Sequence, residues 1–430
     1  MRSPLPNPAS RSYAQAAARV TAYAARLRRL QPAAERVSLS KAFGRVLARP
    51  LLADRDQPPF TRSTRDGYAC RAAEAEKHKP LTIAGAARAG DPPSGPLLPG
   101  TVWEIMNGAP IPTGADAVAS FDHVEKLDGA DAGKIRLLPR RKLKPGENMV
   151  FQGAQASAAD ELLPAGSALH SSQIALAAAC GCTALEVFHR PRVAILTTGD
   201  ELVSIDALPA PGQIRNSNAP MLAALVAASG GEAWLLPTAA DHAQALNLAL
   251  EAVLAQDAAV DLLVLSGGTS AGKFDLVKAA LAHKGARFHF AGLAIQPGKP
   301  TVFAELPRGA GLHPLPVLAL PGNPVASTVA FLLFAAPLLA ALAGSREAQP
   351  RFAQARLAAL VDHGGRPGLT RFLPAFCHFS TLAEQPPQVA LVPAHGSGDL
   401  VALARSNCFL VVPEDAYSLK AGALATILLC

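Results

Sequence analysis

The 430-residue sequence predicts a multidomain protein built around a central parallel α/β domain with helices on both faces of its sheet. Three apolar runs, at residues 192–196, 260–265 and 317–320, each end at a loop rich in glycine or proline that leads into a helical pattern. Continuous apolar runs that alternate with helices are typical of buried parallel strands. The length also exceeds what one hydrophobic core usually serves, so roughly two to four domains are expected.

The N-terminal domain is expected to comprise residues 11–66 and 154–189 and to combine helix with extended pieces. Apolar residues recur at helical spacing from Tyr13 to Leu30, and such a stripe packs either on a core or on a partner subunit. The intervening residues 67–153 are broken repeatedly by proline and glycine, which predicts a β-rich inserted module.

The α/β domain is expected to span residues 190–345, and its repeated strand and helix units favour right-handed crossovers. Its helices are predicted near residues 219–229, 242–256, 275–284 and 324–343. Residues 346–430 carry short strand-like runs separated by glycine and proline, which predicts a small C-terminal β-barrel or sandwich.

One apolar segment has two interpretations. Val325 to Gly344 is twenty mostly apolar residues without a charge, long enough to span a bilayer. However, it follows directly from the third strand and loop, and Ser327, Thr328 and Pro337 interrupt its hydrophobicity. A helix buried against the sheet is therefore the preferred interpretation.

The charge distribution limits the kinds of partner. Residues 1–65 hold thirteen Lys and Arg against three Asp and Glu, a net charge of +10, in a chain of formal net charge +7. Such asymmetry is found in proteins that bind nucleic acid or anionic membranes. Because these basic residues are scattered and few aromatic residues accompany them, a solvated helical face is preferred, with no nucleic-acid or membrane partner.

The cysteines and the N-terminus indicate a location. Six cysteines in a chain of this length do not form a disulfide framework, and no apolar secretory segment is present, so a cytoplasmic location is expected. Cys180 and Cys182 form the only close pair, which indicates a packed helix end in preference to a metal site.

The three strand-end loops predict a site for a phosphate-bearing ligand. In open α/β sheets, ligands bind beyond the carboxyl ends of the strands, where backbone N–H groups and helix ends attract anions. None of the loops fits GxGxxG or GxxxxGK[ST], so neither a dinucleotide fingerprint nor a Walker A loop is present. The candidate ligand-binding residues in these loops are Thr198, Gly199, Ser266, Gly267, Gly268, Ser270, Pro321 and Asn323.

Four acidic residues in glycine or loop contexts are candidates for catalysis: Asp66, Glu201, Asp241 and Asp275. Carboxylates beside phosphate-binding loops are a common way to hold Mg²⁺, and Glu201 and Asp275 each follow a different strand. The simpler alternatives are that Asp241 and Asp275 cap helices and that Asp66, which precedes Gly67, forms a turn.

A lysine between two prolines is a candidate for oxyanion binding. Lys299 and Pro300 belong to a Pro-Gly-Lys-Pro turn that begins at Pro297. A rigid turn could present the ammonium group to an oxyanion, whereas the simpler alternative is a solvated turn lysine. The histidines show no HxxxH or HExxH spacing, so a zinc hydrolase is unsupported.

Taken together, these segments resemble the molybdopterin molybdenumtransferases of the MoeA and gephyrin E-domain type. The order and spacing of the matching motifs cover nearly the whole chain, which makes the combination specific. The motifs are Ser-Thr-Arg-Asp-Gly-Tyr-Ala from Ser63, Ile-Met-Asn-Gly-Ala-Pro-Ile-Pro from Ile105, Thr-Thr-Gly-Asp-Glu-Leu from Thr197, Ser-Gly-Gly-Thr-Ser-Ala-Gly from Ser266, Pro-Gly-Lys-Pro from Pro297, Leu-Pro-Gly-Asn-Pro-Val from Leu320 and His-Gly-Ser-Gly from His395, with a later Ser406-Asn407.

The resemblance implies an elongated homodimer with four domains per chain, able to interact with assembly partners of the molybdenum cofactor. It implies an enzyme that uses Mg²⁺ to cleave adenylylated molybdopterin, inserts molybdate into the dithiolene and releases AMP. Carried over by motif, Glu201 and Asp275 would hold Mg²⁺ and Asp241 would lie at the ligand. Asp66 would reach the site from the partner subunit, and Lys299 and Ser397 would face molybdate.

Several positions depart from the family pattern, and several of these losses fall on the oxyanion-binding side. Gln296 stands where a lysine normally precedes Pro-Gly-Lys-Pro, and the family's Gly-Arg motif reads Gly368-Leu369, with Arg371 nearby. Molybdate is therefore expected to bind more weakly than in the family, and replacing Gln296 by lysine is expected to strengthen binding. The alternative function is a non-catalytic paralogue that binds molybdopterin as a carrier or assembly partner.

Overall fold

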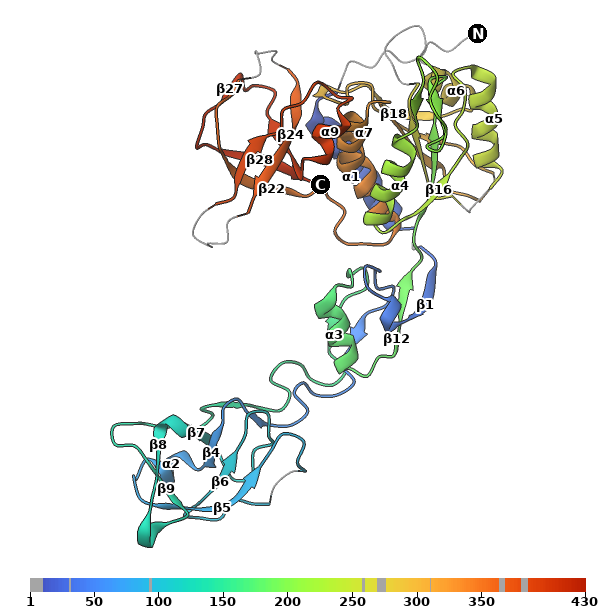
Figure 1. Ribbon diagram of the computed structural model, residues 1–430. Helices are drawn as coiled ribbons and strands as arrows, with labels where there is room; N and C mark the ends of the chain where they lie inside the picture. The colour runs from blue at the N-terminus through green and yellow to red at the C-terminus, as the bar shows by residue number, and fades with distance from the viewer. Residues whose placement is uncertain are drawn as a thin grey trace. The chain divides into compact units, whose positions relative to one another are not determined.

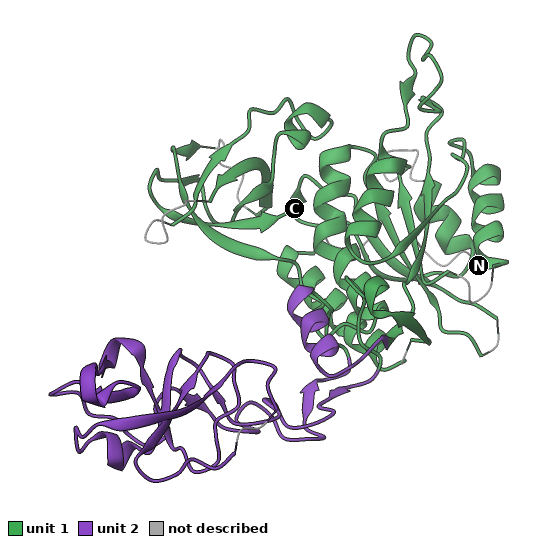
Figure 2. Cartoon of the chain, turned by 60° about the horizontal axis from the view of Figure 1, so that its bottom comes forward, with its two compact units in different colours: residues 1–48, 166–170, 185–430 green, residues 49–165, 171–184 purple. Residues whose placement is uncertain are grey.

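The computed structural model describes residues 11–30, 32–92, 95–256, 260–268, 276–309, 311–362, 368–379 and 386–430. The chain divides into two compact units, which are described separately (Figure 2). Unit 1 consists of Met1–Ala48, Gly166–His170 and Leu185–Cys430, and unit 2 consists of Arg49–Ala165 and Ser171–Ala184.

Unit 1 is organised around a six-stranded sheet in the described part of the chain, with the strand order β16-β13-β17-β21-β20-β18. The first four strands are parallel neighbours, as predicted. Strand β20 pairs antiparallel with β21, and β18 pairs antiparallel with β20, which the apolar runs did not predict. The strands are β13 (Arg192–Thr197), β16 (Glu232–Leu235), β17 (Leu262–Ser266), β18 (Arg287–Ala291), β20 (Val302–Leu306) and β21 (Leu315–Leu320).

Helices cover both faces of this sheet because alternate strand residues point to opposite sides. Val193 and Ile195 of β13 belong to one buried cluster, and Ala194 and Leu196 belong to the other. Helices α1, α4, α7 and α8 pack on the first face, and α5 and α6 on the second (Figure 1). Their bounds are α1 Tyr13–Arg28, α4 Asn218–Ala228, α5 Ala243–Leu254, α6 Leu276–His283, α7 Pro324–Ala330 and α8 Ala336–Leu342.

The N-terminal stripe packs within its own chain. Helix α1 begins with a capping box between Ser12 and Gln15, and its buried side chains pack mainly against α8. Of the two alternatives, the structure selects the core, so this stripe gives no argument for a partner subunit. The buried residues of α1 are Ala16, Val20, Tyr23, Ala24 and Leu27.

The long apolar segment is a core helix, as preferred. Helices α7 and α8 are joined by a π-helical turn at Phe331–Ala335 and form one helix, Pro324–Leu342. This helix is long and apolar enough to cross a membrane, but 78% of its apolar window is buried inside the protein. Its burial against the sheet accounts for its composition without a membrane.

The C-terminal residues form a closed barrel, in agreement with one of the two predicted architectures. The strands β24, β25, β22, β28 and β26 are consecutive neighbours, and a pairing between β24 and β26 closes the ring in the described residues. The two-residue strand β19 (Ile295–Gln296) joins the barrel beside β24 and places Gln296 opposite Arg371. The barrel strands are β22 Phe352–Leu357, β24 Thr370–His378, β25 Gln388–Leu391, β26 Cys408–Val412 and β28 Leu424–Leu429, accompanied by β23 Val361–Asp362, β27 Ser418–Leu419 and α9 Leu400–Ala404.

Shorter pairs of strands complete unit 1. Strand β1 (Ala34–Ser38) pairs with β12 (Ala184–Phe188). Strand β14 (Leu202–Val203) pairs with β15 (Ile214–Arg215) directly after the first strand-end loop.

Unit 2 contains the β-rich module that the proline and glycine breaks predicted. Its described residues form a six-stranded sheet with the order β7-β4-β6-β5-β9-β8. Gly67, at the start of β4, allows close pairing with β7, because a Cβ there would lie 2.1 Å from the carbonyl oxygen of Ala119. The elements are β4 Gly67–Cys70, β5 Leu81–Ala87, β6 Thr101–Ile105, β7 Ala117–Ser120, β8 Val124–Lys126 and β9 Lys134–Leu137, together with β2 Leu51–Leu52, β3 Arg62–Ser63, β10 Met149–Val150, β11 Glu161–Leu163, α2 Ala72–Ala75 and α3 Ser171–Ala179.

Candidate functional site

The three predicted loops meet at one edge of the central sheet. Thr197 of β13 is in register with Ser266 of β17, and Ser266 is in register with Leu320 of β21, so the three strands end side by side. Beyond these ends lies a pocket of about 520 Å³, called here the strand-end pocket. Its lining includes Thr198, Glu201, Asp241, Ser266, Gly267, Gly268, Pro300, Pro321 and Asn323.

The second loop requires its two glycines. Gly267 has a φ of +103°, and a Cβ at this position would lie 2.3 Å from the carbonyl oxygen of Thr198. Gly268 has a φ of +61°, and a Cβ there would lie 2.8 Å from Val277. The first and second loops therefore approach each other more closely than any side chain permits, which leaves backbone groups at the pocket surface.

Two of the four predicted carboxylates line the strand-end pocket. Glu201 folds back over the first loop, since a Cβ at Gly199 would lie 2.6 Å from its carboxylate. The backbone N–H of Asp241 donates to the carboxylate of Asp200, and the Oδ1 atom of Asp241 is buried without a hydrogen-bond partner in the described part of the chain. Asp241 does not cap α5, because His242 does so by accepting a hydrogen bond from Ala245.

The other two predicted carboxylates are placed elsewhere. Asp275 and the ligand candidate Ser270 lie outside the described residues. Asp66 belongs to unit 2, where its carboxylate accepts a hydrogen bond of 2.7 Å from the backbone N–H of Asn107. This contact joins the segment before β4 to the segment after β6 within unit 2.

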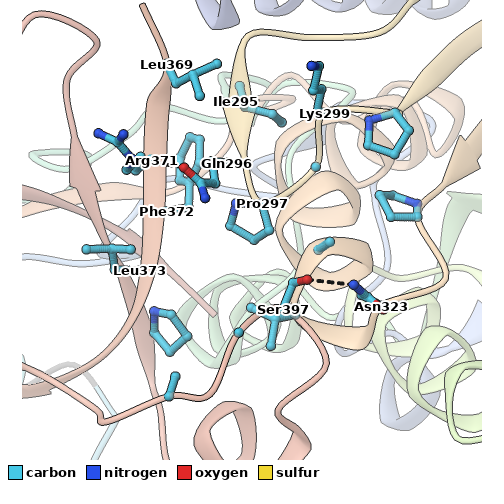
Figure 3. Close-up of a pocket in the computed structure, with 18 residues that line it drawn as sticks. Ile295, Gln296, Pro297, Lys299, Asn323, Leu369, Arg371, Phe372, Leu373 and Ser397 are labelled. Atoms are coloured by element: carbon cyan, nitrogen blue, oxygen red, sulfur yellow. Dashed lines mark hydrogen bonds between the residues drawn. The ribbon is translucent and has the colours of Figure 1, made fainter. Parts of the chain in front are cut away.

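A second pocket, of about 850 Å³, lies between the Pro-Gly-Lys-Pro turn, strand β24 and the loop that contains Ser397, and is called here the barrel-side pocket (Figure 3). The turn is held by Thr301, whose N–H and hydroxyl both donate to the carbonyl of Gly298. Asn323 donates to the Ser397 hydroxyl over 2.6 Å and connects the third loop to the barrel. The described lining is mostly apolar, with Lys299 and Arg371 as its cationic side chains.

Arg371 and Gln296 are paired on one wall of the barrel-side pocket. The Nε atom of Arg371 donates to Oε1 of Gln296 over 3.0 Å, and Arg371 is only 5% exposed. Gln296, which departs from the family pattern, therefore accepts a hydrogen bond from the guanidinium group of Arg371, a cationic side chain of this pocket.

The two pockets are adjacent. Pro300, Pro321 and Asn323 line both of them. The glycine loops line one of these neighbouring pockets and Lys299 lines the other.

Sequence reasoning missed one group of pocket residues. Asn216, Ser217 and Asn218 line the strand-end pocket immediately before and at the start of α4. Asn216 donates to Thr197 and Thr238, and Asn218 donates to Ser266 and to the carbonyl of Gly322. The available signal was the polar sequence Arg-Asn-Ser-Asn ahead of a predicted helix.

Comparisons with known proteins match most of the chain. Residues 11–181 match the MoeA N-terminal region (domain I and II), residues 194–341 a probable molybdopterin binding domain, and residues 356–430 the MoeA C-terminal region (domain IV). A molybdopterin molybdenumtransferase of Nostoc sp. is 34% identical over 88% of this chain and 85% of the relative. The chain belongs to the molybdopterin molybdenumtransferase family.

Further relatives agree with this assignment to a family of transferases in molybdenum cofactor biosynthesis. Molybdopterin molybdenumtransferase 2 of Mycobacterium tuberculosis is 32% identical over 90% of this chain and 92% of the relative. Two structures of the molybdopterin biosynthesis MoeA protein of Pyrococcus horikoshii share the fold. One is 29% identical with a TM-score of 0.66 and covers 95% of this chain and 98% of that chain; the other is 25% identical with a TM-score of 0.75 and covers 98% and 100%.

The matched segments assign the candidate site residues to two regions of the family. The predicted ligand residues from Thr198 to Asn323 fall within the segment that matches the probable molybdopterin binding domain, and Ser397 falls within the C-terminal region. The molybdopterin binding segment and the C-terminal segment therefore both line the barrel-side pocket. The hydrogen bond from Asn323 to Ser397 joins the two segments.

Proposed function

We propose that this protein inserts molybdate into adenylylated molybdopterin with release of AMP. The observation that carries the proposal is the pair of adjacent pockets with different chemistry. The strand-end pocket offers glycine backbone, hydroxyl groups and carboxylates, which suit a phosphate-bearing nucleotide. The barrel-side pocket offers Lys299, Arg371 and the Ser397 hydroxyl, which suit a small oxyanion.

The residues of the strand-end pocket fit a magnesium ion. Glu201 and Asp241 supply oxygen atoms, and one oxygen of Asp241 is buried with no donor among the residues that the structure describes. Oxygen ligands are what Mg²⁺ prefers, and it usually binds through one or two carboxylates plus substrate phosphates. We propose Glu201 as one protein ligand and, from the family resemblance, Asp275 as the other; Asp275 lies outside the described residues. When bound, Mg²⁺ would neutralise the charge of the phosphoanhydride.

The remaining steps are assigned to the chain's own residues. The glycine loops hold the phosphoanhydride, and Lys299 and Ser397 hold molybdate next to the dithiolene of the same ligand. The two thiols of the dithiolene displace one oxygen of molybdate, which leaves as water with the two thiol protons, so molybdenum keeps its oxidation state. Cleavage of the phosphoanhydride bond by water leaves the phosphate on molybdopterin and releases AMP. Asp66 is proposed to reach this site from the partner subunit of a homodimer.

The decisive experiment mixes the purified protein with adenylylated molybdopterin, molybdate and Mg²⁺ and measures AMP. We expect release that requires both molybdate and Mg²⁺. Tight binding of adenylylated molybdopterin without AMP release would contradict the enzymatic function and support the non-catalytic carrier. Light scattering tests the homodimer, and a clean monomer of 44.4 kDa would remove the shared site.

We also propose a cytoplasmic location. All six cysteines, each within the described residues, are free, and four of them are buried. Free thiols are the usual state in a reducing compartment. Fractionation of the cell with an antibody against the protein tests this, and recovery in an extracytoplasmic fraction would contradict it.

A further inference from the structure

Two asparagines two residues apart in the strand-end pocket differ in their hydrogen bonding. The amide of Asn216 is satisfied at both ends: Nδ2 donates to Thr197 and Thr238 over 2.8 and 3.0 Å, and Oδ1 accepts from the backbone of Ala219 over 3.2 Å. Asn216 is also buried, at 9% exposure. These contacts are all internal, so Asn216 holds the loop before α4 in place.

Asn218 is satisfied at one end only. Its Nδ2 donates to the carbonyl of Gly322 over 2.6 Å and to the Ser266 hydroxyl over 2.9 Å. Its Oδ1 is shielded from solvent and has no hydrogen-bond partner among the described residues. A backbone carbonyl only accepts hydrogen bonds, so the atom facing Gly322 must be the amino group, and the amide orientation is determined.

The orientation of Asn218 is held from three parts of the fold. Asn218 is the first residue of α4, Ser266 is the last residue of β17, and Gly322 follows β21. An acceptor held in this way is preorganised, so a ligand that uses it does not have to order the side chain first. A buried carbonyl without a donor is costly, and a donor from the ligand removes that cost.

The chemistry of the missing partner is restricted. A carbonyl oxygen needs an N–H or O–H group, which neither the phosphoanhydride of the proposed ligand nor molybdate supplies at neutral pH. Among the described residues, two more buried atoms of residues that line this pocket have no partner, Oγ1 of Thr198 and Oδ1 of Asp241. The Thr198 hydroxyl can donate or accept, whereas the oxygens of Asn218 and of an ionised Asp241 can only accept.

We propose that Asn218 is a specificity-determining residue that accepts a hydrogen bond from the amino group of a nitrogen heterocycle. This inference rests on the proposed function, because adenylylated molybdopterin contains two such heterocycles, adenine and the pterin. Both carry an exocyclic amino group, and the test below separates them.

The test compares two pairs of ligands by calorimetric titration of the full chain. One pair is AMP and purine riboside monophosphate, and the other is pterin and its desamino analogue; the second member of each pair lacks only the amino group. The wild type should bind the amino member of one pair on the order of tenfold more tightly than its analogue. The pair that shows this preference identifies the heterocycle.

Substitutions then assign the preference to Asn218. In Asn218→Ala the ratio between the paired ligands should fall to about one. The matched variant Asn216→Ala should lower the melting temperature and keep the ratio, because its bonds are internal. If Asn218→Ala does not fold, a wild type that discriminates neither pair still refutes the proposal.

Each outcome is informative. If the wild type releases AMP from adenylylated molybdopterin but discriminates neither pair, the role of Asn218 is wrong and the proposed function stands. A preference that survives Asn218→Ala also refutes the role. If the wild type neither binds these ligands nor releases AMP, the proposed function and this inference both fail.

Discussion

The strand-end pocket and the barrel-side pocket share three lining residues but use different physical means to bind anions. The strand-end pocket relies on backbone that two glycine loops bring together, and on carboxylates suited to a cation. The barrel-side pocket has mostly apolar walls, and its described cations are the side chains of Lys299 and Arg371. Backbone N–H groups remain in place when side chains are substituted. In a pocket that depends on two charged side chains, the affinity for an anion changes when either side chain is replaced.

Two of the positions that depart from the family pattern bear on this difference. Gln296 and Leu369 both line the barrel-side pocket, whereas the motifs of the glycine loops match the family. The comparison predicts that the strand-end pocket binds the nucleotide and that the barrel-side pocket sets the affinity for the oxyanion. Four experiments test that division, beginning with the largest expected effect.

The largest effect should come from removing the proposed metal ligands. Glu201→Ala combined with Asp275→Ala should abolish Mg²⁺-dependent AMP release, because the charge of the phosphoanhydride is then left unbalanced. The fold should persist, since Glu201 is exposed. Glu232→Ala, which removes an exposed carboxylate on the edge strand β16, is the control. Wild-type turnover in the double variant would show that the metal is held elsewhere.

The next prediction compares the stability effects of replacing one glycine in each pocket by alanine. Gly267 and Gly396 both have positive φ angles, +103° and +95°, but a Cβ at Gly396 meets nothing within 4 Å. Gly396→Ala should therefore cost about 1 kcal/mol for the strained backbone alone. Gly267→Ala adds a clash with the Thr198 carbonyl and should cost about 3 kcal/mol or more. Urea unfolding measures both, and equal losses would contradict the role of close approach.

Removing the barrel-side lysine should affect molybdate alone. Lys299→Met removes a charge-assisted contact worth roughly 1.5 to 3 kcal/mol, so the molybdate concentration for half-maximal AMP release should rise about tenfold to a hundredfold. The affinity for the adenylate should change little. Lys420→Met, an exposed lysine of the barrel region, serves as the control. A parallel loss of adenylate affinity would contradict the division between the two pockets.

The sequence was most informative where backbone geometry makes the site. Buried strands, glycine loops and the order of the motifs predicted the sheet, the barrel and the meeting of the three loops, because these depend on local hydrophobicity and on turns. The antiparallel strands β18 and β20 were not predicted, since no apolar run distinguishes an antiparallel from a parallel neighbour.

Side-chain contacts between distant segments could not be predicted. Asn218 pairs with a carbonyl 104 residues away, and Gln296 with a guanidinium 75 residues away. Such contacts depend on how loops meet in space and leave no periodic signal in the sequence. The same limit applies to Asp241, whose position suggested a helix cap although the neighbouring His242 fills that role.

The smallest effect, Gln296→Lys, sharpens the comparison most. The family pattern alone predicts that a lysine here strengthens molybdate binding. The structure gives a reason to expect the opposite, because Oε1 of Gln296 accepts a hydrogen bond from Arg371. A lysine would remove this acceptor and place a second cation against a guanidinium that is 5% exposed.

We therefore expect Gln296→Lys to require a severalfold higher molybdate concentration for AMP release, a smaller change than in Lys299→Met. Gln296→Met, which removes the acceptor without adding charge, separates the two causes and should give an intermediate loss. Titration of AMP release against molybdate distinguishes these outcomes. A lower molybdate requirement in Gln296→Lys would mean that the lysine reaches the anion itself and that Arg371 does not depend on residue 296 for its position.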